Sequence, residues 1–256
     1  MNKYLLIIAF FVFVVVRSSA INHQHLKAVE YKHSKKSIRA FNIISLDGKN
    51  EKVYVLSPFM GNELKICYHN DTISVTNVQS MEGGIKILNK KFIAIKYQVF
   101  SGSDENSENS ILLCVDKKRL FNALNINSLS SYDNINDHGI FKTVETLKGN
   151  SKKTYKLNVE IHQDAYSKLN PLTNFNYDNL SVLSFDGTRN VFYSVKKDIY
   201  ENFTMDDEKT NKQYKQKIAG NYPVIIIGDN YYYFIKDAWY EVGRNNCLIK
   251  YSSSNK

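Results

Sequence analysis

Short apolar runs recur along the chain from residue 38 onwards, and each is closed by turn-forming residues. The runs are rich in Ile, Val, Tyr and Phe, as in "AFNIISL", "KVYVL", "LKICY", "FIAIKYQVF" and "ILLCV". Gly, Asp, Asn and Ser follow them, as at Asp47-Gly48. β-branched and aromatic runs of this length between turn residues are typical of strands. The pattern predicts a mainly β, β-rich α+β protein.

A polar stretch divides the strand pattern into two parts. Residues 127–154 are rich in Asn, Ser, Asp and Lys, and strand-like runs resume at "YKLNVEI". We therefore expect two sequential antiparallel β-modules, with residues 127–154 as the linker between them. The expected modules cover residues 38–126 and 155–245, and residues 246–256 form a polar tail.

One or two short helices are expected beside the strands. The strongest candidate is "KKRLFNALNI", residues 117–126. On a helix, its apolar residues Leu120, Phe121, Leu124 and Ile126 share one face.

The first 20 residues have the features of a secretory signal. Lys3 gives a positive start, residues 4–16 are uncharged and apolar, and Ser18 and Ala20 are small residues before the expected cleavage site. The alternative is a membrane anchor, but a span needs roughly 20 apolar residues. We expect cleavage after Ala20 and a secreted or extracellular chain that starts with a basic, flexible leader at residues 21–37.

The charge balance favours anionic partners. The formal net charge is +9, and it falls to +7 when Lys3 and Arg17 leave with the signal. Basic exported proteins are attracted to sulfated glycans, acidic lipid headgroups and acidic proteins. A solvated basic surface without a specific partner is the alternative. Nucleic acid is not expected as a partner, because the basic residues are scattered and the chain is exported.

The segment "NYPVIIIGDNYYYFIKDAWYEV", residues 221–242, has the highest density of aromatic residues. The "GDN" between its apolar and aromatic runs predicts a hairpin. Tyrosine and tryptophan supply large contact areas in recognition surfaces. The candidate binding residues are therefore Tyr231, Tyr232, Tyr233 and Trp239, and the alternative is that these side chains pack inside the fold.

No motif identifies an enzyme. The chain contains no G-x-S-x-G, H-E-x-x-H, Walker or G-x-G-x-x-G sequence, so we name no catalytic residue, no metal ligand and no cofactor. The alternative is a secreted hydrolase whose site is assembled from distant segments. Its candidate residues are His138, His162, Asp164 and Asp186.

The cysteines and sequons are compatible with an exported chain but are not specific to one. Cys67, Cys114 and Cys247 allow one disulfide and one free thiol, or three buried thiols, and Cys114 within "ILLCV" is expected to be buried. Three N-x-S/T sequons make Asn70, Asn179 and Asn202 the glycosylation candidates.

The second half of the chain resembles the FAINT domain, a module repeated in secreted proteins of piroplasm parasites. The resemblance rests on "YKLNVEI", on "NFNY", and on an apolar strand, a turn, an aromatic strand and a tryptophan at the close. A fainter match runs from "FNIISL" to "ILLCVDKKRLF". The resemblance implies a β-rich, non-catalytic parasite antigen, placed on the parasite surface or exported into the host cell, and it supplies no ligand.

Together these features favour a secreted, non-enzymatic surface or host-interaction protein. Its expected partner is a protein or an anionic glycan or lipid surface, with no transmembrane segment after signal cleavage. The secreted hydrolase remains the alternative function.

Overall fold

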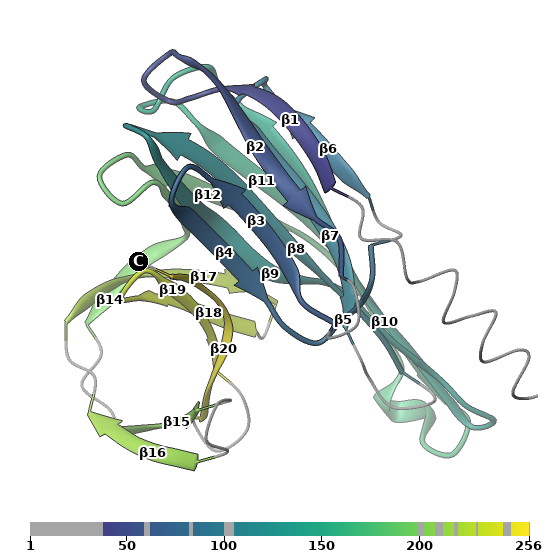
Figure 1. The fold of residues 1–256 in the computed structure, drawn as a ribbon. Helices are drawn as coiled ribbons and strands as arrows, with labels where there is room; N and C mark the ends of the chain where they lie inside the picture. The colour runs from purple at the N-terminus through teal and green to yellow at the C-terminus, as the bar shows by residue number, and fades with distance from the viewer. Residues whose placement is uncertain are drawn as a thin grey trace, which may run out of the picture.

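The fold is built almost entirely from β-strands (Figure 1). The computed structural model describes residues 38–58, 62–81, 84–99, 105–198, 202–207, 212–217, 220–228, 230–242 and 247–255. Within these residues, the one helical element is the short 3-10 helix η1 (Pro171–Thr173). The prediction of a mainly β protein is confirmed. The expected signal and leader lie outside the described residues.

The strands form two hydrogen-bonded sheets, which are antiparallel except for a short parallel contact between β15 and β20. The first sheet contains β1 (Ile38–Ile44), β2 (Asn50–Leu56), β3 (Leu64–Tyr68), β4 (Asp71–Val75), β14 (Val195–Asp198), β15 (Asn202–Asp207), β16 (Lys212–Lys217), β17 (Asn221–Ile227), β18 (Asn230–Ile235), β19 (Ala238–Val242) and β20 (Cys247–Asn255). The second sheet contains β5 (Val78–Ser80), β6 (Ile85–Leu88), β7 (Phe92–Val99), β8 (Glu105–Asp116), β9 (Arg119–Asp133), β10 (Asp137–Lys148), β11 (Lys156–Ser167), β12 (Phe175–Asp186) and β13 (Val191–Tyr193).

The two sheets do not follow the expected division into sequential halves. The order of the first sheet is β1-β2-β3-β4-β20-β19-β18-β17-β14, so its early strands join its late strands where Ser74 of β4 pairs with Ser253 of β20. The second sheet is formed by the intervening residues 78–193. Residues 246–256, expected to be a polar tail, instead contribute β20 between β4 and β19.

Strands β7, β8 and β9 form a central layer that is buried on both faces. Ile93, Ile95 and Leu113 pack with β1–β4 on one face. Phe92 and Leu112 pack on the other face, with side chains of β10–β12 and β17–β19. Strands covered on both sides need apolar residues at consecutive positions, which explains the uninterrupted run "ILLCV" in β8.

The expected helix at residues 117–126 is wrong, because this segment is the start of β9. Both faces of β9 are buried, so its apolar residues do not alternate strictly. Its pairing with β8 also shifts register at Leu112/Leu113. Such irregularities break the two-residue period. The apolar residues of this segment are therefore spaced like those on one face of a helix.

The expected linker at residues 127–154 is also wrong over most of its length. It contains the end of β9 and all of β10, whose buried Phe141 and Thr143 alternate with the exposed Lys142 and Val144. Its polar composition reflects strands with one face in solvent rather than a connection between modules.

Candidate functional site

The aromatic residues proposed as a binding face lie mainly inside the fold. Tyr232 and Trp239 are fully buried, and Tyr233 is 5% exposed. Only Tyr231 presents a large exposed surface, at 41%. A shared recognition face formed by these four side chains is therefore wrong, and the alternative that they pack inside the fold is confirmed for the three buried ones.

The buried aromatic side chains connect the first sheet to β9. The indole Nε1 of Trp239 donates a hydrogen bond to the carbonyl oxygen of Asn122 at 2.9 Å. The hydroxyl of Tyr232 accepts one from the backbone N–H of Asn127 at 3.1 Å. Burial raises the pKa of Tyr232 well above its usual value. Tyr233 faces the opposite side of β18, where it packs with Val224 and Leu248.

Asp186 lies apart from the other three hydrolase candidates. His138 lies against Asp164, with Nε2 and Oδ2 3.7 Å apart. His162 forms a separate pair with Asp178, with Nδ1 and Oδ1 2.7 Å apart. Asp186 lies eight residues beyond Asp178 along β12, about 26 Å away at the usual rise per residue. General acid–base catalysis needs groups within hydrogen-bond reach of a common substrate, and Asp186 is too far away to act with the others. His138, His162 and Asp164 lie together on one face of the β10–β11 pair.

The glycosylation candidates lie at different places on the surface. Asn70 is exposed in the turn between β3 and β4, and Asn179 is exposed on β12. The backbone of Asn202 begins β15, and its side chain lies outside the described residues.

The cysteines that the structure describes are free thiols. Cys67 is half-buried, and Cys114 is fully buried, as expected. Burial raises the pKa of the Cys114 thiol, and the negative charge of the nearby Asp116 carboxylate raises it further. Such a thiol is a poor nucleophile.

Lysine residues occupy turns that meet at one end of the molecule. Residues 89–91 join β6 to β7, Lys117-Lys118 join β8 to β9, and residues 149–155 join β10 to β11. The backbone N–H of Ile44 donates to the carbonyl oxygen of Lys90 at 2.7 Å, and the Asn89 side chain donates to the carbonyl oxygen of Gly149 at 2.8 Å. We call this region the basic end and define it by Lys90, Lys91, Lys117, Lys118 and Lys153.

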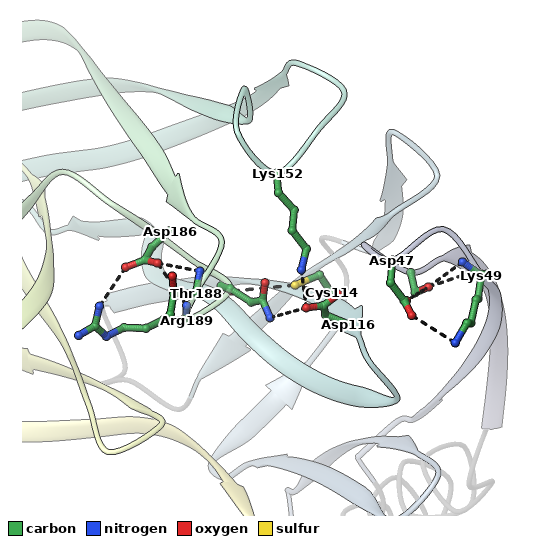
Figure 2. Close-up of polar contacts among 10 residues, drawn as sticks. Asp47, Lys49, Cys114, Asp116, Lys152, Asp186, Thr188 and Arg189 are labelled. Atoms are coloured by element: carbon green, nitrogen blue, oxygen red, sulfur yellow. Dashed lines mark hydrogen bonds and ion pairs between the residues drawn. The ribbon is translucent and has the colours of Figure 1, made fainter.

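Two buried carboxylates hold these turns in place (Figure 2). Asp116 accepts hydrogen bonds from the ammonium of Lys152 and, at 3.2 Å, from the side-chain amide of Asn190. Asp186 accepts hydrogen bonds from the backbone N–H of Thr188 and the guanidinium of Arg189. Asp116 therefore ties the turn after β8 to those after β10 and β12, whereas Asp186 orders the turn after β12 itself.

Asp186 is held ionised by its neighbours. Burial acts to raise its pKa, but hydrogen bonds from Lys196, from the backbone of Thr188 and from Arg189 outweigh that effect and lower the pKa to about 2. Its charge is thus committed to Lys196 and Arg189, whose cations lie 3.0 and 3.1 Å from Oδ2.

The five lysines of the basic end are not neutralised in this way. None of them forms a salt bridge with a carboxylate among the described residues. Lys90, Lys117, Lys118 and Lys153 are exposed, and Lys91 is half-buried. Ammonium groups gathered on one end produce a positive potential that attracts anions.

The turn between β8 and β9 places its lysines in an unfavourable backbone conformation. Asp116 pairs with Arg119, so Lys117 and Lys118 form a two-residue hairpin turn. Their φ angles are 48° and 61°. Turns with positive φ at both positions favour Asn-Gly, because a Cβ is disfavoured there. The sequence "DKKR" contains this turn, but Lys117 and Lys118 were expected to begin a helix.

A second exposed feature lies at the opposite end of the second sheet. The ends of β9–β12 extend beyond the body as an arm, with η1 at its tip (Figure 1). Ile135, Leu169 and Leu172 are 86%, 75% and 97% exposed there. Lys168 links the two tip loops through a hydrogen bond from its backbone N–H to the carbonyl oxygen of Asn136 at 2.8 Å. Exposed aliphatic side chains in a hydrogen-bonded tip suit contact with an apolar surface.

No group of three or more His, Cys, Asp or Glu side chains able to hold a metal ion occurs among the described residues. Within the same residues, no helix is long and apolar enough to cross a membrane. Comparison with known proteins found no matching family model and no significantly similar curated protein or solved structure.

Proposed function

We propose that this protein is an exported, non-enzymatic β-rich protein that binds an anionic surface through its basic end. The observation that carries the proposal is the pair Lys117-Lys118, which occupies two positive-φ positions where Asn-Gly is preferred. Both side chains are exposed and therefore gain little packing in return. Local strain without a packing benefit supports a role in binding.

The arrangement of the turns supports the same conclusion. Buried Asp116 and Asp186 form ion pairs with Lys152, Arg189 and Lys196. These internal pairs leave the five lysines of the basic end available to an external anion. Because the turns come from separate hairpins and are held together by hydrogen bonds, the charges are presented by a fixed framework rather than by a flexible tail.

The ligand chemistry that fits this end is a repeated sulfate, carboxylate or phosphate group. An ammonium is a compact point charge that pairs with such anions without demanding a fixed planar geometry. An exported protein meets these groups on sulfated glycans and on acidic lipid headgroups. We favour the sulfated glycan, and vesicles containing an acidic lipid serve as the second arm of the test.

The direct test measures binding of the full chain to immobilised heparin and to vesicles with and without phosphatidylserine. We expect heparin binding at low salt that weakens strongly above about 0.3 M salt, because exposed charges are then screened. Binding to phosphatidylserine vesicles alone would assign the site to lipid instead. Absence of binding to both would overturn the proposal.

A matched pair of variants locates the site. Lys117→Gln/Lys118→Gln should weaken heparin binding by about tenfold, corresponding to about 1.4 kcal/mol. Lys142→Gln/Lys168→Gln removes the same charge from the middle of β10 and from the tip of the arm, and should change binding by less than about twofold. Equal losses in the two variants would show that only net charge matters, and the basic end would then have no special role.

Export is the second part of the proposal, and the pattern of residues 1–20 supports it. Mass spectrometry of the chain recovered from the medium of a secreting host should find a new N-terminus after Ala20. An uncleaved chain retained in cells would contradict this part. The similarity to FAINT-domain proteins stays a prediction from the hydrophobic pattern and is consistent with an exported, non-catalytic protein.

A further inference from the structure

A broad groove adjoins the basic end on the outer side of the first sheet. It has a volume of about 1240 Å³ and is lined by residues of β1–β3 and by Ile87 and Lys90 from the second sheet. Among the described pairings, β1 pairs only with β2 and β6 only with β7, so each is an edge strand. The groove therefore lies where the free edges of the two sheets approach each other, bridged by the hydrogen bond from Ile44 N–H to the carbonyl oxygen of Lys90.

Tyr54 provides an exposed aromatic ring in this groove. Val53 and Val55 on either side of it are fully buried, so the alternation along β2 directs Tyr54 to the outer face, where it is 43% exposed. It lies opposite Ala40 on β1 and Cys67 on β3, which are both small residues. A tyrosine ring flanked by small side chains leaves its face accessible to a flat apolar surface, such as the C–H face of a sugar ring.

Polar groups surround this ring. Asn42 and Lys52 are directly opposite each other on β1 and β2. Asn50 lies two residues before Lys52 on β2, on the same face of the sheet. Side-chain amides both donate and accept hydrogen bonds, as sugar hydroxyls require. Lys52 and Lys90 add positive charge, and His69 lies at the border with its Nε2 3.9 Å from Oε2 of Glu51.

The groove and the basic end form one continuous surface, because Lys90 belongs to both. We propose that this groove binds one to a few residues of an acidic saccharide, with Tyr54 stacked on a sugar ring, Asn42 and Asn50 on hydroxyls, and Lys52 and Lys90 on sulfate or carboxylate groups. The inference rests on the proposed function and deepens it, since it adds recognition of the sugar itself to attraction by charge. A polyanion that lacks sugar rings would use only the lysine turns.

The test compares two exposed tyrosines. Tyr54→Ala removes the ring from the groove, whereas Tyr132→Ala removes a ring of similar exposure, 42%, from the arm. Neither change alters the charge. We expect Tyr54→Ala to raise the Kd for a heparin-derived hexasaccharide, measured by titration calorimetry, by about tenfold. Tyr132→Ala should leave that Kd unchanged, and both variants should bind inorganic polyphosphate as the unaltered protein does.

The outcomes separate the two proposals. If the unaltered protein binds the hexasaccharide but Tyr54→Ala and Tyr132→Ala behave alike, the groove is not the saccharide site, while binding by the basic end stands. If Tyr54→Ala weakens polyphosphate and hexasaccharide equally, the ring contributes no sugar recognition and the inference is wrong. If the unaltered protein binds neither ligand, the proposed function itself fails. Equal thermal unfolding of both variants is the control for folding.

Discussion

The aromatic hairpin and the lysine turns differ in how much of their side chains they expose. Residues 231–239 hold four consecutive aromatics and the chain's only tryptophan, yet most of that aromatic surface is buried against β9 and β17–β20. The lysines at residues 90–91, 117–118 and 153 belong to ordinary turn motifs, yet they gather at one exposed end. The dense aromatic segment therefore marks a packed part of the fold, whereas the lysines in turns mark an exposed one.

The reason for the difference is physical. An aromatic side chain gains free energy in proportion to the apolar area that it buries, so a strand with such residues on both faces tends to be covered on both. A lysine at a positive-φ turn position gains neither burial nor backbone stability. Lys117 and Lys118 therefore stay exposed, as does Lys236 in the positive-φ turn between β18 and β19.

The largest effect is expected at Trp239. Its ring fills the space between β19 and β9, and its Nε1–H bonds the carbonyl oxygen of Asn122. Trp239→Ala should lower the free energy of unfolding by about 3–5 kcal/mol through the cavity left behind. Tyr231→Ala, at an exposed position of the same hairpin, should lower it by less than about 1 kcal/mol. Urea unfolding of both variants measures the difference.

Trp239→Phe keeps the fold measurable if the alanine variant does not fold. It retains most of the buried apolar area and loses the indole hydrogen bond, so a loss of about 1–3 kcal/mol is expected. If Trp239→Phe and Tyr231→Ala are both as stable as the unaltered protein, the aromatic hairpin does not stabilise the fold by packing. The contrast between the hairpin and the lysine turns would then be wrong.

The replacement Lys117→Asn/Lys118→Gly should separate stability from binding. Asn-Gly suits positive φ at both turn positions, so the free energy of unfolding should rise by about 1–2 kcal/mol. Heparin binding should weaken at the same time, because two cations leave the basic end. Urea unfolding and heparin binding, measured on the same preparation, show whether stability rises while affinity falls. A gain in stability with unchanged binding would mean that these lysines serve no anionic partner.

A pH-dependent effect is expected from the acid titration of Asp186. Its pKa is about 2 in the folded protein and about 3.9 in an unfolded chain, so ionised Asp186 stabilises the fold above about pH 4. This contribution is lost as the pH falls from about 4 to 2, because the carboxyl group is then protonated in the folded as well as in the unfolded protein. Asp186→Asn should therefore lower the unfolding midpoint at pH 6 and have a smaller effect at pH 2. An equal effect at both pH values would contradict a carboxylate held ionised by Lys196 and Arg189.

Much of the local structure followed from the sequence. The β class, the strands in "KVYVL" and "LKICY", and the burial of Cys114 could all be predicted, because the alternation and length of apolar runs depend on neighbouring residues. Prediction was wrong where burial on both faces or a register shift removed the two-residue period, as in β9, and where one polar face masked the alternation of β10.

The sequence by itself determined that this chain forms strands, where many of its turns lie, and that it carries excess positive charge. Only the tertiary structure decided that β4 pairs with β20, that Tyr232 and Trp239 point into the core, and that lysines from three hairpins share one end with the Tyr54 groove. The physical reason is that strand formation depends on short-range residue patterns. Pairing between strands far apart in the chain depends on which faces bury the most apolar area together, and no local pattern records that choice.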